Sequence, residues 1–155
     1  MLYFDDGKPF ATGSIPYTYR PIREEETSPR IIVNVMIGDL QTSAYVDTGG
    51  VFLLCAPEVA LHLGLEARNG IPTQRLLSRG TWLSGVLHRV SLTLPADQGI
   101  ALTIDATAFV PELAPHQEWA DDFPCILGMS GCLERLRFAI DPAGDTFYFG
   151  ELSEN

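Results

Sequence analysis

The residues best suited to chemistry follow one another directly at the end of an apolar stretch. Asp47, Thr48, Gly49 and Gly50 come immediately after the hydrophobic residues 44–46. Apolar surroundings keep a carboxylate dry and strengthen its electrostatic interactions. The glycines let the backbone pass close to the acid, and the Thr48 hydroxyl is expected to brace the loop by a hydrogen bond across it. The pattern favours carboxylate chemistry, although by itself it is equally typical of an ordinary turn at a strand end.

Two strands must position this acid. Residues 31–37 are mostly β-branched, and residues 41–46 form a second strand-like stretch. Gly38-Asp39 lies between them and is a turn signal, so we expect a β-hairpin that delivers Asp47 at its end.

The chain divides by composition into an arm, a domain and a tail. Residues 1–30 are interrupted by six Pro and Gly residues, which predicts an irregular N-terminal arm or leader with at most one short strand at 15–19. We expect one folded domain over residues 31–150 and a C-terminal tail over 151–155.

The remainder is also rich in strand signals. A short helix is predicted at 56–65, with Pro57 in its first turn and Ala60, Leu61 and Leu63 facing the core. A second short helix is predicted at 130–136. The further strands expected are 73–78, 86–94, 100–110, 125–128, 137–140 and 146–149.

The order of these segments resembles the retropepsin-like (retroviral-type) aspartic peptidase family, in its bacterial, gag-polyprotein-like form. In that family an apolar strand enters Asp-Thr-Gly, as at 46–50, and a helical turn ends in Leu-Gly-Leu, as at 63–65. A second signature, an aliphatic pair followed by Gly, is matched by Ile126-Leu127-Gly128. The interval between the signatures holds a flap hairpin, for which 73–94 with its Gly-rich tip is suited. The resemblance covers residues 31–149.

The resemblance implies a mainly β, single-domain acid-protease fold: a closed β-barrel with a flap hairpin and one or two short helices. It implies catalytic roles for Asp47, Thr48 and Gly49. It also implies that substrate is bound by Gly50, Val51, Gly80, Thr81, Trp82 and Ile126.

The single Asp-Thr-Gly triplet implies a homodimer. An aspartic peptidase needs two carboxylates, one as general base and one as general acid, and this chain supplies one Asp47. We therefore expect two copies to meet about a two-fold axis and to hydrolyse a peptide or protein substrate. A further alternative is a peptidase that is activated by removal of residues 1–30.

Three departures from the family pattern keep a second function open. Gly50 stands where the family usually has Ala, Val51 where it often has a polar residue, and Ser130 where it often has Asp or Asn. Weakened substrate contacts would suit a catalytically silent fold that acts as a peptide-binding or dimerisation module. The intact Asp47-Thr48-Gly49 favours the enzyme.

Charge and cysteine usage exclude several other classes. The net charge of −10 disfavours nucleic-acid and membrane partners. Three cysteines without paired spacing indicate free thiols and a cytoplasmic location. The three histidines lie far apart, so neither a metal site nor a cofactor is expected. Residues 128–132 miss the Gly-x-Ser-x-Gly pattern of a serine nucleophile because Cys132 replaces the last glycine.

Overall fold

β-branched and aromatic residues fill the stretches between the many Gly and Pro residues, and these stretches form strands. The computed structural model describes residues 1–119 and 123–152; part of the predicted tail lies outside this range. The helical elements are α1 (Pro57–His62) and the 3₁₀ turns η1 (Ala67–Asn69) and η2 (Leu133–Arg135). The strands are β1 (Leu2–Tyr3), β2 (Pro9–Ala11), β3 (Gly13–Pro16), β4 (Thr18–Arg20), β5 (Arg30–Ile37), β6 (Leu40–Val51), β7 (Leu53–Leu54), β8 (Ile71–Pro72), β9 (Leu76–Ser78), β10 (Thr81–Leu94), β11 (Gln98–Gly99), β12 (Leu102–Glu112), β13 (Cys125–Ser130), β14 (Leu136–Asp141) and β15 (Thr146–Glu151).

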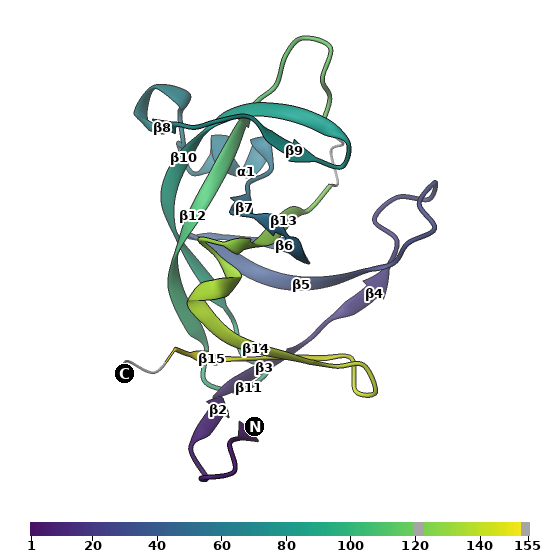
Figure 1. The fold of residues 1–155 in the computed structure, drawn as a ribbon, viewed down its shortest axis with the longest axis vertical. Coiled ribbons are helices and arrows are strands. Elements are labelled where there is room, and N and C mark those ends of the chain that lie inside the picture. Colours follow the sequence, from purple (N-terminus) through teal and green to yellow (C-terminus); the bar gives the residue numbers. More distant parts are fainter. Residues whose placement is uncertain (120–122, 153–155) are drawn as a thin grey trace.

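The main sheet carries the candidate site at its centre. Its order is β4-β5-β6-β13-β7-β12-β10-β8, and β9 pairs with β10 as a hairpin (Figure 1). A short pairing of β5 with β10 links two sides of this path. Through this pairing the path β5-β6-β13-β7-β12-β10 returns to its first strand, and β4 and β8 extend beyond it. The fold is therefore mainly β, as predicted.

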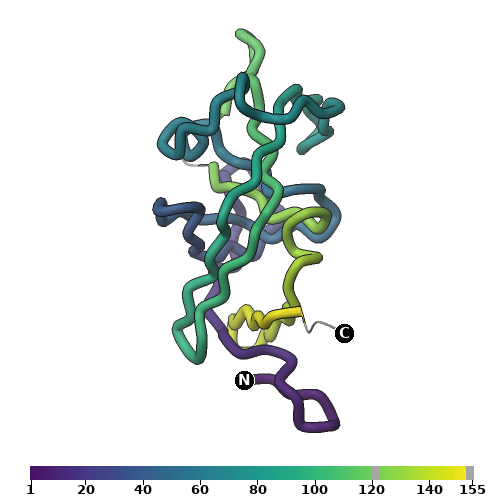
Figure 2. Tube along the Cα trace, turned by 90° about the vertical axis from the view of Figure 1, so that its left-hand side faces the viewer, coloured from purple at the N-terminus to yellow at the C-terminus, as the bar shows by residue number. Residues whose placement is uncertain are grey.

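The longest hairpin joins the two ends of the molecule. β10 and β12 pair antiparallel from Leu94 and Leu102 at one end to Ser84 and Glu112 at the other. Figure 2 shows the two strands side by side along the long axis of the molecule. One end of β10 belongs to the flap hairpin, and the other lies near a separate sheet of order β11-β3-β15-β14.

The N-terminal segment is more regular than predicted. β3 inserts between β11 and β15, β4 extends the main sheet beside β5, and Ile15 is buried. We expected at most one short strand, at 15–19, whereas the structure has two strands there, β3 and β4, in addition to β1 and β2. Gly and Pro limit β3 and β4 to three or four residues, and such short strands are stabilised by pairing with distant parts of the chain, which local patterns do not show.

The predicted hairpin over 31–46 is confirmed, but both helix predictions need correction. The first helix is shorter than 56–65, and its Leu61 is 83% exposed rather than in the core. A six-residue helix presents only one narrow stripe to the sheet, and that stripe is Val59 and Ala60. In place of a helix over 130–136, β13 continues to Ser130 and only the 3₁₀ turn η2 follows.

Two apolar clusters fill the interior. The larger packs the main sheet against α1 and against the separate sheet β11-β3-β15-β14. The smaller lies beneath the flap side and contains Ile22, Ile32, Tyr45, Leu54, Leu83, Phe109, Phe123 and Ile126. None of the helices over the described residues combines the length and apolar character needed to cross a membrane.

Candidate active site

Asp47 lies near the end of β6, beside β13. The two strands run parallel, and Gly128 lies opposite Asp47 in their register. The Asp47 side chain is partly buried, and the Gly49 N–H donates to its Oδ1 at 3.1 Å. A Cβ at Gly50 would lie 3.3 Å from Asp47 Oδ2, so the backbone passes directly by the carboxylate. A Cβ at Gly49 would lie 3.4 Å from Asp47 Oδ1, so glycine at both positions leaves the carboxylate room beside the backbone.

Gly128 packs against the backbone of residues 50–52, which follow Asp47. Its N–H donates to the Phe52 carbonyl oxygen at 2.8 Å, and the Phe52 N–H donates to the Ser130 carbonyl at 2.8 Å. A Cβ at position 128 would lie 2.4 Å from that Phe52 oxygen. Phe52 itself has φ of 60°, a backbone conformation rarely adopted by bulky residues. The glycine of the second signature is thus required by a close backbone approach.

The other predicted residues of this segment occupy different environments. Thr48 is exposed, and its hydroxyl makes no hydrogen bond with any described residue, so the expected bracing bond is absent within one chain. Val51 is 43% exposed and lies opposite Ser130. Ile126 is buried in the smaller apolar cluster, two residues before Gly128. Its contact with a substrate stays a prediction.

The flap is a tight hairpin with an exposed tip. Arg79 and Gly80 form its turn, both with positive φ, and β9 pairs with the start of β10 on either side of it. Gly80, Thr81 and Trp82 are exposed. The Gln117 side-chain amide donates to the Trp82 carbonyl at 3.0 Å, which connects the hairpin to the loop before β13.

Comparisons with known proteins identify the fold. No protein-family model and no curated protein sequence matches the chain. Among solved structures, a retropepsin-like aspartic protease from Rickettsia conorii superposes with a TM-score of 0.58 at 20% identity, over 88% of this chain and 89% of that one. This chain has a retropepsin-like fold. The retroviral protease-like domain of Ddi1 from Leishmania major matches with a TM-score of 0.49 at 19% identity, over 81% of this chain and 96% of that domain.

Within this retropepsin-like fold, a buried tyrosine underlies the acid. Tyr45 is two residues before Asp47 on the same face of β6, and it is 2% exposed. Burial, and secondarily the charge of Asp47, raise the pKa of Tyr45 to about 12. Its phenol is therefore neutral at ordinary pH and supports the site by packing.

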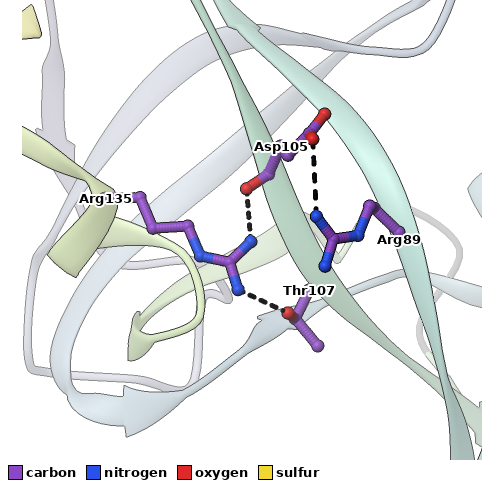
Figure 3. Close-up of polar contacts among 4 residues, drawn as sticks. All are labelled: Arg89, Asp105, Thr107 and Arg135. Carbon is purple, nitrogen blue, oxygen red and sulfur yellow. Dashed lines mark hydrogen bonds and ion pairs between the residues drawn. The ribbon is translucent and has the colours of Figure 1, made fainter.

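An arginine connects the segment after β13 to β12 (Figure 3). Arg135 donates to the Asp105 carbonyl oxygen and, at 3.0 Å, to the Thr107 hydroxyl. The Thr107 N–H in turn donates to the Gly131 carbonyl at 2.8 Å. Arg89 reaches the Asp105 carboxylate from β10 at 3.5 Å. Arg135 thus positions the end of β13 relative to the long hairpin, a role that its sequence context does not signal.

A cavity of about 470 Å³ lies under the flap. It is lined by residues of the flap hairpin, by the loop before β13 and by two residues elsewhere: Ser78, Arg79, Thr81, Leu83, Leu113, His116, Gln117, Glu118, Trp119, Arg23 and Phe123. Asp47 does not line it, but the Phe123 ring stacks edge-on against Tyr45 with centroids 6.0 Å apart. Of the three predicted flap residues, Thr81 lines this cavity, whereas Gly80 and Trp82 line another one on the same hairpin. Arg23 and Phe123 escaped prediction because they are 100 residues apart in sequence.

The described residues offer no cluster of three or more His, Cys, Asp or Glu side chains that would hold a metal ion. Cys55, Cys125 and Cys132 are buried free thiols.

Proposed function

We propose that this chain is an aspartic endopeptidase that acts as a homodimer. One observation carries the proposal: the partly buried Asp47 carboxylate is held at a strand end by the Gly49 N–H, opposite the tightly packed Gly128. A scaffold has no physical need for an acid in such a loop. The retropepsin-like fold supports the proposal without deciding activity.

Two Asp47 carboxylates, one from each copy, would perform the reaction together. Close carboxylates share a proton, so one is ionised and the other protonated. The ionised group takes a proton from a water molecule, whose oxygen attacks the peptide carbonyl carbon. The protonated group gives its proton to the carbonyl oxygen. The group that took the proton from water then gives it to the peptide nitrogen as the C–N bond breaks. The other group recovers its proton from the diol, and the products are a carboxyl group and an amine.

The exposed Thr48 is accessible to a second copy. Its hydroxyl lies next to Asp47 and has no partner among the described residues of the single chain. A second copy that brings its own Asp47 close would also bring backbone groups to this hydroxyl. The flap residues Gly80, Thr81 and Trp82 would then cover a bound peptide and exclude water.

The test is cleavage of a mixed peptide library between about pH 3.5 and 7.5, read by mass spectrometry. Parent protein is compared with Asp47→Asn, and Asp39→Asn is the matched control because Asp39 is an exposed carboxylate in the β5–β6 turn. We expect cleavage by the parent and by the Asp39 variant, strongest at acidic pH, and none by Asp47→Asn. Sedimentation establishes whether each protein is a dimer. Undiminished cleavage by Asp47→Asn would overturn the assignment.

The second candidate is a peptide-binding module. The apolar Val51 beside the acid, and a flap cavity that Asp47 does not line, favour it. A dimer that binds library peptides but cleaves none across this pH range would establish the module in place of the enzyme.

A further inference from the structure

Two buried thiols face each other on neighbouring strands. β7 and β13 run antiparallel, and Leu54 lies opposite Ile126 in their register. One step further, the same register places Cys55, directly after β7, opposite Cys125, the first residue of β13. Both side chains are fully buried and belong to the larger apolar cluster. The two cysteines, 70 positions apart in sequence, are therefore a cross-strand pair.

The spacing of this pair suits a disulfide. The Cys55 N–H donates to the carbonyl oxygen of Phe109 on β12 at 2.9 Å, so the backbone of Cys55 is turned away from β13. Opposed residues that do not exchange backbone hydrogen bonds have Cα atoms about 4.5 Å apart. A disulfide spans Cα separations of about 4.4–6.8 Å. The strands therefore need no rearrangement for a bond between Cys55 and Cys125.

Hydrogen bonds make one of the two sulfur atoms the more reactive. Cys125 Sγ accepts from the Ala56 N–H at 3.3 Å and from the Cys55 thiol. The bond from the Cys55 thiol, helped by that from Ala56, lowers the pKa of Cys125, and the same thiol bond raises the pKa of Cys55. Because the thiolate is the form that attacks an oxidant, Cys125 is expected to react first and Cys55 to resolve the product.

A small oxidant can reach the pair by local opening of the strand ends. Cys125 begins β13, and Cys55 lies just beyond the two-residue β7. Such ends open at a lower free energy than the centre of a sheet. We propose that Cys55 and Cys125 form a reversible disulfide when the protein meets hydrogen peroxide.

The reaction consumes one peroxide and gives two water molecules. The Cys125 thiolate attacks one peroxide oxygen, the O–O bond breaks, and the products are a sulfenic acid and hydroxide. Hydroxide takes up the proton that the Cys125 thiol lost and becomes water. The Cys55 sulfur then attacks the Cys125 sulfur as the S–O bond breaks, and the Cys55 proton leaves with the hydroxyl group as the second water.

The bond would join the two segments that surround the candidate acid. Cys55 is eight residues after Asp47, and Cys125 is three residues before Gly128. The closed loop of about 70 residues contains the flap hairpin. A cross-link of this length restricts the unfolded chain and thereby stabilises the folded one. This stabilisation is a property of the fold and requires no peptide cleavage.

The test is a disulfide map of the folded parent protein after treatment with hydrogen peroxide. Remaining thiols are alkylated in denaturant, and the protein is digested without reductant for mass spectrometry. We expect a linked pair of peptides that contain Cys55 and Cys125, which dithiothreitol separates. Cys132 should be recovered alkylated, because burial raises its pKa to about 12. Sulfoxide at Met1, which is 45% exposed, shows that the oxidant has acted.

Two variants and a stability measurement complete the test. Cys132→Ala should keep the linked pair, and Cys55→Ala should lose it. The urea midpoint of the oxidised parent should lie about 1–2 M above that of the reduced parent, with no such rise in Cys55→Ala. Alkylated Cys55 and Cys125 in a sample with oxidised Met1, a linked pair that includes Cys132, or an unchanged midpoint would overturn the proposal. If Cys55→Ala does not fold, the map and midpoint of the parent decide.

Discussion

Substitution of Gly128 by alanine should destabilise the protein more than a change of one methyl group suggests. The added Cβ would lie 2.4 Å from the carbonyl oxygen of Phe52, 2.7 Å from the carbonyl carbon of Val51 and 2.9 Å from that of Gly50. All three are backbone atoms, which do not rotate away as the end of a side chain does. Because Cβ contacts under 3.0 Å are essentially never seen, the Phe52 carbonyl must retreat by about 0.6 Å.

The magnitude follows from two terms. Retreat of Phe52 weakens the 2.8 Å hydrogen bond from the Gly128 N–H, and loss of such a bond costs about 0.5–1.5 kcal/mol. Overpacking of the interior adds about 1–3 kcal/mol. We therefore expect the free energy of unfolding to fall by about 2–4 kcal/mol, a large share of the 5–15 kcal/mol or so that is typical of a domain. Displacement of residues 50–52 should also remove peptide cleavage.

Urea denaturation followed by circular dichroism measures this loss. The control is Gly144→Ala, in the β14–β15 turn, where a Cβ would approach only the side-chain ends of Asp141 and Thr146, at 3.1 Å or more. That variant should stay within about 0.5 kcal/mol of the parent. If Gly128→Ala were equally stable, β13 and the segment after Asp47 would not be packed as closely as described, and the account of the second signature would be refuted.

Two further predictions concern groups that support the site. Folding raises the pKa of Tyr45 from its usual 10.0 to about 12, so its contribution to stability is intact below about pH 10 and is lost as the pH rises toward 12. In an ultraviolet titration a late tyrosine step should disappear in Tyr45→Phe, and an unchanged titration would contradict the packing. Arg135→Ala should lower the free energy of unfolding by about 1–3 kcal/mol through the lost bonds to Asp105 and Thr107, whereas Arg89→Ala, which breaks an exposed pair, should cost under about 1 kcal/mol in the same urea assay.

The resemblance read from the sequence anticipated much of the frame around the acid. The alternating and β-branched residues on either side of Gly38-Asp39 predicted the hairpin that ends at Asp47, and the structure confirms it. The flap hairpin and the strand at 125–128 were also predicted. These features are set by residues close together in sequence, through strand periodicity and turn conformations, and local patterns report them well.

Contacts between distant segments were beyond such patterns. The burial of Ile15 depends on pairing between β3 and β15, which are more than 100 residues apart. The exposure of Leu61 depends on which side of a six-residue helix meets the sheet.

The sequence by itself determined that one acid, one hydroxyl and two glycines follow a hydrophobic strand. It also determined that an aliphatic pair and a glycine come later, with the glycine 81 residues after the acid. Only the tertiary structure decided that Gly128 meets the turn beside Asp47, and that Arg23 and Arg79 share the ring of Phe123. The physical reason is that hydrophobic burial and strand pairing act between whatever segments the fold brings together, irrespective of their separation along the chain.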